Sequence, residues 1–340
     1  MKTKIIFDLS KEYPLLAHDE IISTIHSEHI EHTIVSSSEN VLIIQSELTN
    51  EQLDLLAHRL SMSFSIGHLL FTGPPTVSDM KDLAKNHPTS LNGSLAVRYK
   101  NRSNHIHSKP LVQAIADVYT QSTTVDLYHP DHTIFLLITN EQVYVYEKIA
   151  TIDRSIYEKR KAHLRPFFSP ISLHPKIARA LVNITRAKSG DSVLDPFCGT
   201  GGFLIEAGLM NMRVIGSDIS EEMIAGAQKN LLSYHIQSPL MIATDIASLP
   251  KQLTEKVDAI ITDLPYGKAT STRGEEIHSL YSRAMNSIQY LLKPGKRAVI
   301  GSFSEDLKIK KYEHLDHIVS YPLRVHRSLT RWFHVFEKKP

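Results

Sequence analysis

Apolar and polar residues alternate in short runs through the first seventy residues, with two amphipathic stretches between the runs. Alternation with a period of two predicts strands, and an apolar face every three to four residues predicts helices. Thr49 stands three residues before Gln52, the spacing of a capping box, so a helix should begin there. The resulting order, strand–helix–strand–strand–helix–strand, is typical of a ferredoxin-like unit, which by itself indicates no chemistry. The expected strands are residues 4–9, 33–36, 41–45 and 63–71, and the first helix is residues 18–27.

A Gly-Pro-Pro sequence at residues 73–75 predicts a turn between this unit and a second one that ends near residue 150. In the second unit, two alternating runs flank Asn140 and Glu141 and predict a β-hairpin. The elements expected here are strands at 95–100 and 123–128, a helix at 110–120, and hairpin strands at 133–139 and 142–147.

The rear of the chain begins with a charged stretch, residues 151–165, which predicts a helix, and three prolines that follow mark a domain border. Beyond it, apolar runs alternate with amphipathic stretches, the pattern of a doubly wound α/β domain with a parallel sheet. Two β-rich runs around residues 327–331 predict an antiparallel final pair. Strands are expected at 192–195, 213–218, 240–244, 257–263 and 297–303, with helices at 202–210, 221–234 and 275–292.

Composition narrows the class of protein. The 340 residues fit two or three domains, and 42% hydrophobic with 22% charged residues exclude a chain that is disordered or coiled coil throughout. Residues 1–150 hold 11 Lys and Arg against 17 Asp and Glu, whereas residues 151–340 hold 27 against 19. The basic rear part suggests an anionic partner. The single cysteine, Cys198, excludes an intrachain disulfide framework and a multi-cysteine zinc site, and no metal is expected.

The expected location is cytoplasmic. The start of the chain has no signal-peptide core, because Asp8 follows a run of only three apolar residues. The longest uncharged stretch, residues 60–78, contains His68 and two prolines and reads as a strand with a turn rather than a membrane span. A chain with one cysteine also fits a reducing compartment.

A glycine-rich turn follows the first strand of the rear domain, in the sequence Asp-Pro-Phe-Cys-Gly-Thr-Gly-Gly at residues 195–202. Glycines let the backbone approach a ligand, and the start of the next helix offers unpaired N–H groups. The spacing matches neither a P-loop nor the dinucleotide fingerprint. Each of the next three strands also leads to a carboxylate, at Asp218, Asp245 and Asp263. Because carboxyl ends of strands in a doubly wound sheet line one crevice, these acids should meet there.

Four acids around one crevice would repel phosphates and suit a ligand with a cationic centre and neutral hydroxyls. S-adenosylmethionine has both. Asp218, about 20 residues after the glycines, is placed to accept hydrogen bonds from the ribose hydroxyls, and Asp245 can accept one from the adenine amino group. The residues expected to bind this cofactor are Ser172, Asp195, Pro196, Phe197, Gly199, Thr200, Gly201, Asp218, Ile219, Asp245 and Ile246.

The sequence Asp263-Leu264-Pro265-Tyr266 resembles the (Asp/Asn)-Pro-Pro-(Tyr/Phe) motif of methyltransferases that act on exocyclic amino groups, and residues 195–201 resemble their motif I. Leu264 departs from the usual first proline. The chemistry fits these residue types: the Asp263 carboxylate and the carbonyl of Leu264 or Pro265 would hold both amine N–H groups and aim the lone pair at the methyl group. Tyr266 would stack on the base. These four are the expected catalytic residues.

The resemblance extends to most of the chain. Residues 165–175 are similar to the segment before motif I in tRNA guanosine N2-methyltransferases that carry a THUMP domain, residues 125–131 with the hairpin resemble that domain, and residues 327–331 resemble the family's last strand pair. Asp rather than Asn at residue 263 favours the members that modify guanosine-10. The resemblance implies a ferredoxin-like unit at 1–73, a THUMP-like RNA-binding domain at 74–150, a linker at 151–170, and a Rossmann-like methyltransferase domain at 171–340.

The implied partner is tRNA, with or without a small activating subunit. Residues 83–116 contain no acid but several basic residues, which is either a solvated face or a phosphate-binding surface. The residues expected to contact RNA are Arg98, Lys100, Arg102, Lys109, Lys159, Arg160, Lys161 and Arg165.

Two other classes of function stay open. One is an amino-methyltransferase acting on DNA adenine or cytosine, on rRNA guanine, on tRNA guanosine-6 or on a protein glutamine. The other is an RNA-binding protein without activity. Cys198 is expected to pack in the glycine turn rather than act as a nucleophile, because methylation of an amino group needs no covalent adduct. The number of methyl groups added stays undetermined.

Overall fold

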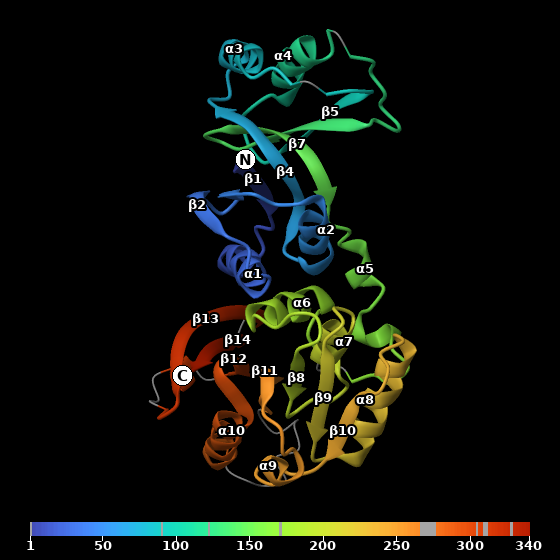
Figure 1. Cartoon of the computed structure of the whole chain (residues 1–340), viewed down its shortest axis with the longest axis vertical. Coiled ribbons are helices and arrows are strands. Elements are labelled where there is room, and N and C mark those ends of the chain that lie inside the picture. Colours follow the sequence, from blue (N-terminus) through green and yellow to red (C-terminus); the bar gives the residue numbers. More distant parts are fainter. Residues whose placement is uncertain are drawn as a thin grey trace. The chain divides into compact units, whose positions relative to one another are not determined.

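The computed structural model describes residues 2–89, 91–121, 123–169, 172–265, 277–303, 305–308, 312–326 and 329–340. They form two compact units (Figure 1). The N-terminal unit comprises residues 1–14, 30–58 and 63–153, and the C-terminal unit comprises residues 15–29, 59–62 and 154–340. No helix in these ranges is long and apolar enough to cross a lipid bilayer.

The N-terminal unit is built on one seven-stranded sheet in the order β2-β3-β1-β4-β7-β6-β5. Its predicted capping box is confirmed: the Thr49 N–H donates to Gln52 Oε1 at 3.0 Å, and the Gln52 N–H donates to Thr49 Oγ1 at 3.2 Å. The elements are β1 (Thr3–Leu9), β2 (His32–Ser37), β3 (Val41–Ser46), α2 (Asn50–Arg59), β4 (Ser63–Gly73), α3 (Val77–Asn86), β5 (Leu95–Asn101), α4 (Ser108–Tyr119), β6 (His132–Ile138) and β7 (Val143–Thr151).

The two units predicted before residue 150 share this sheet. Strand β4 pairs antiparallel with β7, so the turn at residues 73–75 does not separate two compact units. The apolar faces of both strands make this pairing favourable, because Ile66 and Val145 are fully buried. Helix α3, which follows the turn, was not predicted.

The strand predicted at residues 123–128 is wrong. Within the described part of this stretch, Val125 makes a single bridge, to Leu95. Asp126 then accepts hydrogen bonds on Oδ1 from the N–H groups of Tyr128 (2.7 Å) and His129 (3.0 Å). A carboxylate that binds its own following backbone favours a turn over an extended strand.

The C-terminal unit has a second seven-stranded sheet, in the order β10-β9-β8-β11-β12-β14-β13. The first five strands run parallel and β13 pairs antiparallel with β14, as the sequence predicted, whereas the position of β14 between β12 and β13 was not predicted. Helix α7 packs on both α6 and α8, and α9 packs on α10 (Figure 1). The strands are β8 (Ser192–Asp195), β9 (Arg213–Asp218), β10 (Leu240–Ala243), β11 (Val257–Asp263), β12 (Leu292–Ser302), β13 (Leu315–His326) and β14 (Leu329–Lys338). The helices are α6 (Pro175–Ile184), α7 (Gly202–Gly208), α8 (Glu221–Ser233), α9 (Leu249–Gln252), α10 (Ile277–Leu291) and the 3₁₀ turn η2 (Glu305–Lys308).

The long helix predicted at residues 151–165 is not formed. Strand β7 runs to Thr151, α5 covers only Ser155–Glu158, and Ala162–Leu164 is a 3₁₀ turn, η1. Arg160 of this segment is held within the C-terminal unit, since its Nε donates to Glu206 Oε1 at 2.9 Å. The contacts of this segment are therefore made with residues distant in the sequence, and one continuous helix does not form.

Two short segments from early in the chain fold with the C-terminal unit. Helix α1 (Pro14–Ser27) carries Glu20, which is fully buried and accepts hydrogen bonds from the Ser61 N–H and from Asn183 Nδ2, both at 3.0 Å. Burial raises the pKa of Glu20. Arg59 donates from Nη2 to Asn183 Oδ1 at 3.0 Å. Because Asn183 lies in α6, this polar network ties α1 to a helix of the C-terminal unit.

Candidate active site

The glycine-rich turn follows β8 and leads into α7. Gly199 and Gly201 have φ values of +49° and +80°, in the left-handed region that favours glycine. The turn is fastened to β9, since the Cys198 N–H donates to the Ser217 carbonyl at 2.8 Å. It is also fastened to the end of that strand, since the Gly199 N–H donates to Asp218 Oδ2 at 3.0 Å.

Asp218 therefore holds the glycine turn in place, in addition to its predicted contact with the ribose hydroxyls. Its Oδ1 accepts the Ser220 N–H at 2.9 Å, so each oxygen already holds one backbone hydrogen bond. A carboxylate oxygen can accept a second bond, which leaves capacity for ribose hydroxyls. Ile219, the next residue, is 39% exposed and offers an apolar surface beside the carboxylate.

Asp195 ends β8 and is 2% exposed. Its Oδ1 accepts hydrogen bonds from Thr262 Oγ1 at 2.7 Å and from the Phe197 N–H at 3.2 Å. Burial raises the pKa of Asp195 to about 7, and the negative charges of Asp218 and Asp263 also raise it. The two hydrogen bonds lower the pKa but do not offset burial. A cation placed beside this carboxylate would lower its pKa again.

Asp245 follows β10 and accepts the Ala247 N–H on Oδ1 at 2.9 Å. Arg283 of α10 pairs with the same oxygen at 2.5 Å, a contact that the sequence did not predict. The side chain of Asp245 is one-third exposed. Ile246 lies in the hydrophobic core at 3% exposure, so a contact of this residue with the cofactor would come from its backbone.

The other expected cofactor residues lie around the same turn. Ser172 donates to the carbonyl of Ser169 at 3.1 Å. The carbonyl of Thr200 accepts from Asn230 Nδ2 of α8 at 3.0 Å. Pro196 is buried, and Phe197 is partly buried against the core that includes the end of β8.

Asp263 ends β11 beside these groups. Its Oδ2 pairs with Nη1 of Arg331 at 3.0 Å, while Oδ1 is buried and has no hydrogen-bond partner among the described residues. Burial raises the pKa of Asp263 to about 6, and the charge of Arg331 opposes the rise. The carboxylate therefore has unfilled acceptor capacity.

The backbone after Asp263 is fixed by two contacts. The Leu264 N–H donates to the carbonyl of Gly301 at 2.9 Å, and the Leu264 side chain is fully buried. Tyr281 donates its hydroxyl to the Pro265 carbonyl at 3.3 Å. A carbonyl oxygen can accept two hydrogen bonds, so the carbonyls of both Leu264 and Pro265 stay candidates for the second amine acceptor. Tyr266 lies outside the described residues.

Several residues expected to contact RNA are held inside the protein. The Arg102 side chain is 7% exposed and pairs with Asp8, and it also donates to the Leu9 carbonyl at 2.7 Å. Lys100 lies 3.3 Å from Asp8 and 3.2 Å from the centre of the Phe64 ring. These contacts give both cations a structural role and do not fit a direct phosphate contact by Arg102.

The same correction applies to two residues of the linker. Arg160 makes two hydrogen bonds at 2.9 Å to the buried carboxylate of Glu206, which Arg179 shares at 2.9 Å. Arg165 is 6% exposed and donates from Nε to the Arg160 carbonyl. Neither side chain offers its charge to an RNA on the surface. Of the expected set, Arg98, Lys109 and Lys159 are exposed, and Lys161 is partly exposed and paired with Glu158.

Cys198 is buried, and burial raises the pKa of its thiol well above the usual range. The negative charges of Asp195 and Asp218 raise this pKa as well. A thiol that resists ionisation is a poor nucleophile. This supports a packing role.

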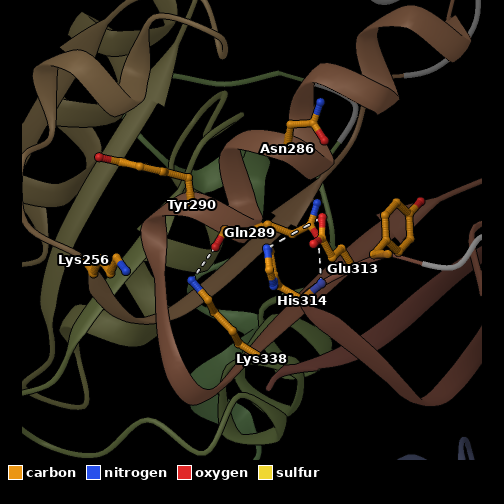
Figure 2. A pocket seen from close by; sticks show the side chains of 8 residues that line it. Lys256, Asn286, Gln289, Tyr290, Glu313, His314 and Lys338 are labelled. Carbon is orange, nitrogen blue, oxygen red and sulfur yellow. Dashed lines mark hydrogen bonds and ion pairs between the residues drawn. The ribbon is translucent and has the colours of Figure 1, made fainter. Parts of the chain in front are cut away.

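A groove of about 640 Å³ lies elsewhere in the C-terminal unit (Figure 2). Lys338 on its floor donates to the carbonyl of Gln289, and the His314 N–H donates to Gln289 Oε1 at 3.2 Å. Lys256, which precedes β11, also lines it. The groove is therefore at the amino ends of the parallel strands, opposite the carboxyl ends that carry the acids, and no sequence-predicted site residue lines it.

The site also contains residues that sequence reasoning missed. Thr262 is a buried neighbour of the motif, Arg283 lies on a helix without a motif, and Arg331 belongs to the last strand pair, where only a strand was expected. Of these residues, Arg331 could have been noticed from the sequence, because it lies inside a predicted strand. Charged side chains are rarely buried unless they are paired, so an arginine in a buried strand indicates an acidic partner.

Comparison with known proteins decides between the open classes. A family model described as an RMKL-like methyltransferase domain matches residues 162–331, half of the chain. A DNA methylase family model matches residues 78–229. The tRNA (guanine(10)-N2)-dimethyltransferase of Methanothermobacter thermautotrophicus is 35% identical over 335 residues, which cover 97% of this chain and 98% of that protein.

The chain belongs to this dimethyltransferase family. A second relative with the same name, from Pyrococcus abyssi, is 34% identical and covers 83% of this chain and 85% of its own. Among solved structures, TrmN from Thermus thermophilus has a TM-score of 0.57 at 19% identity and covers 98% of this chain and 99% of its own, which shows the same fold. The family membership makes the chain a methyltransferase that uses S-adenosylmethionine, as the sequence predicted.

Proposed function

We propose that this chain transfers two methyl groups from S-adenosylmethionine to the N2 amine of guanosine-10 in tRNA, because its relatives are named tRNA (guanine(10)-N2)-dimethyltransferases. The observation that carries the proposal is the Asp263 carboxylate, which ends β11 with unfilled acceptor capacity beside the glycine turn and three further acids.

The donor set fits this cofactor. Buried Asp195 accepts hydrogen bonds from neutral donors in the described structure, and burial raises its pKa to about 7. A cationic ligand group would stabilise the ionised form of such a carboxylate. We assign Asp195 to the cofactor's ammonium group, Asp218 to the ribose hydroxyls and Asp245 to the adenine amino group. When bound, the cofactor supplies a methyl group on a positively charged sulfur. The negative charges of Asp195 and Asp218 favour a ligand that carries this positive charge.

Asp263 and the carbonyl of Leu264 or Pro265 would accept the two N–H bonds of the guanine amine. An aromatic amine attacks poorly because its lone pair is delocalised into the ring. Acceptors on both N–H bonds turn the lone pair toward the methyl group and stabilise the positive charge that develops on nitrogen. Holding two reactants in line can itself lower the barrier by about 7–11 kcal/mol. The target base must leave its stack to reach Asp263, at a cost of a few kcal/mol.

Support for RNA binding comes from the exposed cations. We assign phosphate contacts to Arg98, Lys109, Lys159 and Lys161, and a THUMP-like RNA-gripping role to residues 74–150. We keep Tyr266 as the residue that stacks on the base. A small activating subunit is compatible with this assignment.

The test uses the purified full chain, labelled cofactor and a tRNA transcript that carries guanosine or inosine at position 10. Inosine lacks the 2-amino group, so transfer should vanish with it, and nucleoside mass spectrometry should find dimethylguanosine in the guanosine transcript. Continued methylation of the inosine transcript would refute the amine assignment. A duplex DNA substrate run in parallel addresses the DNA methylase match, and methylation of DNA alone would replace the proposed substrate.

A variant pair tests the role of Asp263. Asp263→Ala should lose most turnover and keep its affinity for S-adenosylhomocysteine. Asp316→Ala, which removes a side chain that is 63% exposed in the same unit, serves as the control and should keep its rate. Equal rates for both variants would remove Asp263 from the mechanism.

A further inference from the structure

Strand β14 brings an arginine to the end of β11. Arg331 is 5% exposed, and its Nη1 lies 3.0 Å from Asp263 Oδ2. Its guanidinium also lies 5.5 Å from the centre of the Phe303 ring. A guanidinium that is clamped between a carboxylate and a ring has little freedom to turn, so the geometry of the ion pair is fixed.

The two charged groups come from strands that are not neighbours. Strand β12 lies between β11 and β14, and its residue Gly301 pairs in register with Asp263 on one side and with Phe333 on the other. A Cβ at position 301 would overlap Asp263 Oδ1 and come within 2.8 Å of the Phe333 ring. Because glycine has no side chain, position 301 leaves room for the Asp263 carboxylate beside Arg331.

The charges around Asp263 show what the pair does. Arg331 on β14 is the charged group that lowers the pKa of Asp263, and the charge of Asp263 in turn raises the pKa of Asp195 on β8. Burial raises the pKa of Asp263 to about 6 even with the arginine present. Without Arg331 the carboxyl group would be protonated over much of the neutral pH range.

We propose that Arg331 is a positioning residue for methyl transfer, which holds the Asp263 carboxylate ionised and in one orientation. This inference rests on the proposed function. A protonated Asp263 would donate a hydrogen bond from one oxygen and so oppose an amine that also donates. Paired with Arg331, the carboxylate presents acceptors only, which is the pattern that an amine with two N–H bonds requires.

The first experiment does not depend on the substrate. Protein labelled with ¹³C at the aspartate carboxyl carbons is titrated by NMR without ligands, and the Asp263 signal is identified by its absence in Asp263→Asn. Arg331→Met should raise the pKa of Asp263 by about 1–3 units, and Arg331→Lys by less. Arg297→Met is the matched control, because Arg297 is 10% exposed and pairs with Glu337 at 2.9 Å in the same sheet. It should leave the Asp263 signal unchanged.

The second experiment measures methyl transfer against pH. The acid limb of the wild-type rate should shift to higher pH in Arg331→Met, with a rate loss at pH 7 of about two- to hundred-fold that shrinks as the pH rises. Affinity for S-adenosylhomocysteine should stay within about twofold of wild type, which also shows that the variant is folded.

An unchanged Asp263 pKa, or a rate loss equal at every pH, would overturn the proposal. Loss of S-adenosylhomocysteine binding in both Arg331 variants would also overturn it in favour of a purely structural role. If the wild-type chain does not methylate guanosine, the proposed function fails, and the NMR titration still decides whether Arg331 controls Asp263.

Discussion

Replacing Thr262 by valine tests the state of Asp195. Thr262 is fully buried, and its hydroxyl donates to Asp195 Oδ1 at 2.7 Å. Valine keeps the shape of the side chain and removes the donor. A hydrogen bond to a charged group contributes about 1.5–3 kcal/mol, and one pKa unit corresponds to about 1.36 kcal/mol. Thr262→Val should therefore raise the pKa of Asp195 from about 7 to roughly 8–9.

The expected consequence is weaker cofactor binding with a changed pH dependence. Because the ionised form of Asp195 binds the cofactor's ammonium group, affinity should rise with pH through the pKa of this carboxyl. At pH 7 the ionised fraction falls from about one half to about 1–10%, so the affinity for S-adenosylhomocysteine should drop about 5- to 50-fold. The loss should shrink between pH 7 and pH 8.5, since the variant then ionises as well.

Isothermal titration calorimetry at several pH values measures this directly. Thr185→Val is the matched control, because Thr185 is 1% exposed and its hydroxyl donates to the Val182 carbonyl at 2.6 Å, away from the site. It should cost stability without changing the pH dependence of binding. Equal affinity of wild type and Thr262→Val at pH 7 would refute the role given to Asp195.

Three further predictions concern buried charge, the thiol and RNA. Glu206→Gln should lower the free energy of unfolding by about 3–5 kcal/mol in chemical denaturation, because buried Arg179 and partly buried Arg160 lose the charge of their shared, fully buried carboxylate; a loss below 1 kcal/mol would contradict this. Cys198→Ala should methylate at the wild-type rate, and native protein should resist iodoacetamide, whereas rapid labelling would show an accessible thiolate. Arg98→Ala and Lys109→Ala should each weaken tRNA binding and lower the salt slope by about one, whereas Arg102→Ala should mainly lower stability; unchanged salt slopes would remove the first two from the interface.

Much of the fold was predictable because local patterns agree with tertiary packing. The capping box at Thr49 and Gln52 works through contacts three residues apart, and the hairpin around Asn140 depends on neighbouring strands. The errors arose where distant contacts decide. The stretch 151–165 looks helical by charge pattern, yet Arg160 is committed to Glu206, 46 residues away. No local pattern reports such a pairing.

The residues of the candidate site also fall into two groups, those that the sequence predicted and those that it did not. The four acids were predictable because each follows a strand, and parallel strands bring their carboxyl ends together. Their partners were not, since Arg331 comes from the last strand and Arg283 from a helix face. The basic stretch before residue 116 misled for the same reason. Arg102 is bound to Asp8, 94 residues away, and a charge count along the sequence treats it as exposed.

The carboxylates of Asp195 and Asp263 have different surroundings, and the difference follows from their proposed ligands. Asp195 is assigned to a cationic group, so the ligand itself can neutralise the carboxylate, and neutral donors suffice until it arrives. Asp263 is assigned to a neutral amine, which brings no charge before the methyl group is transferred. Its counter-ion must therefore come from the protein, and Arg331 lies 3.0 Å away. If both carboxylates bound cations, an arginine beside Asp263 would repel its ligand, so the placement of Arg331 favours the neutral amine as the group that Asp263 receives.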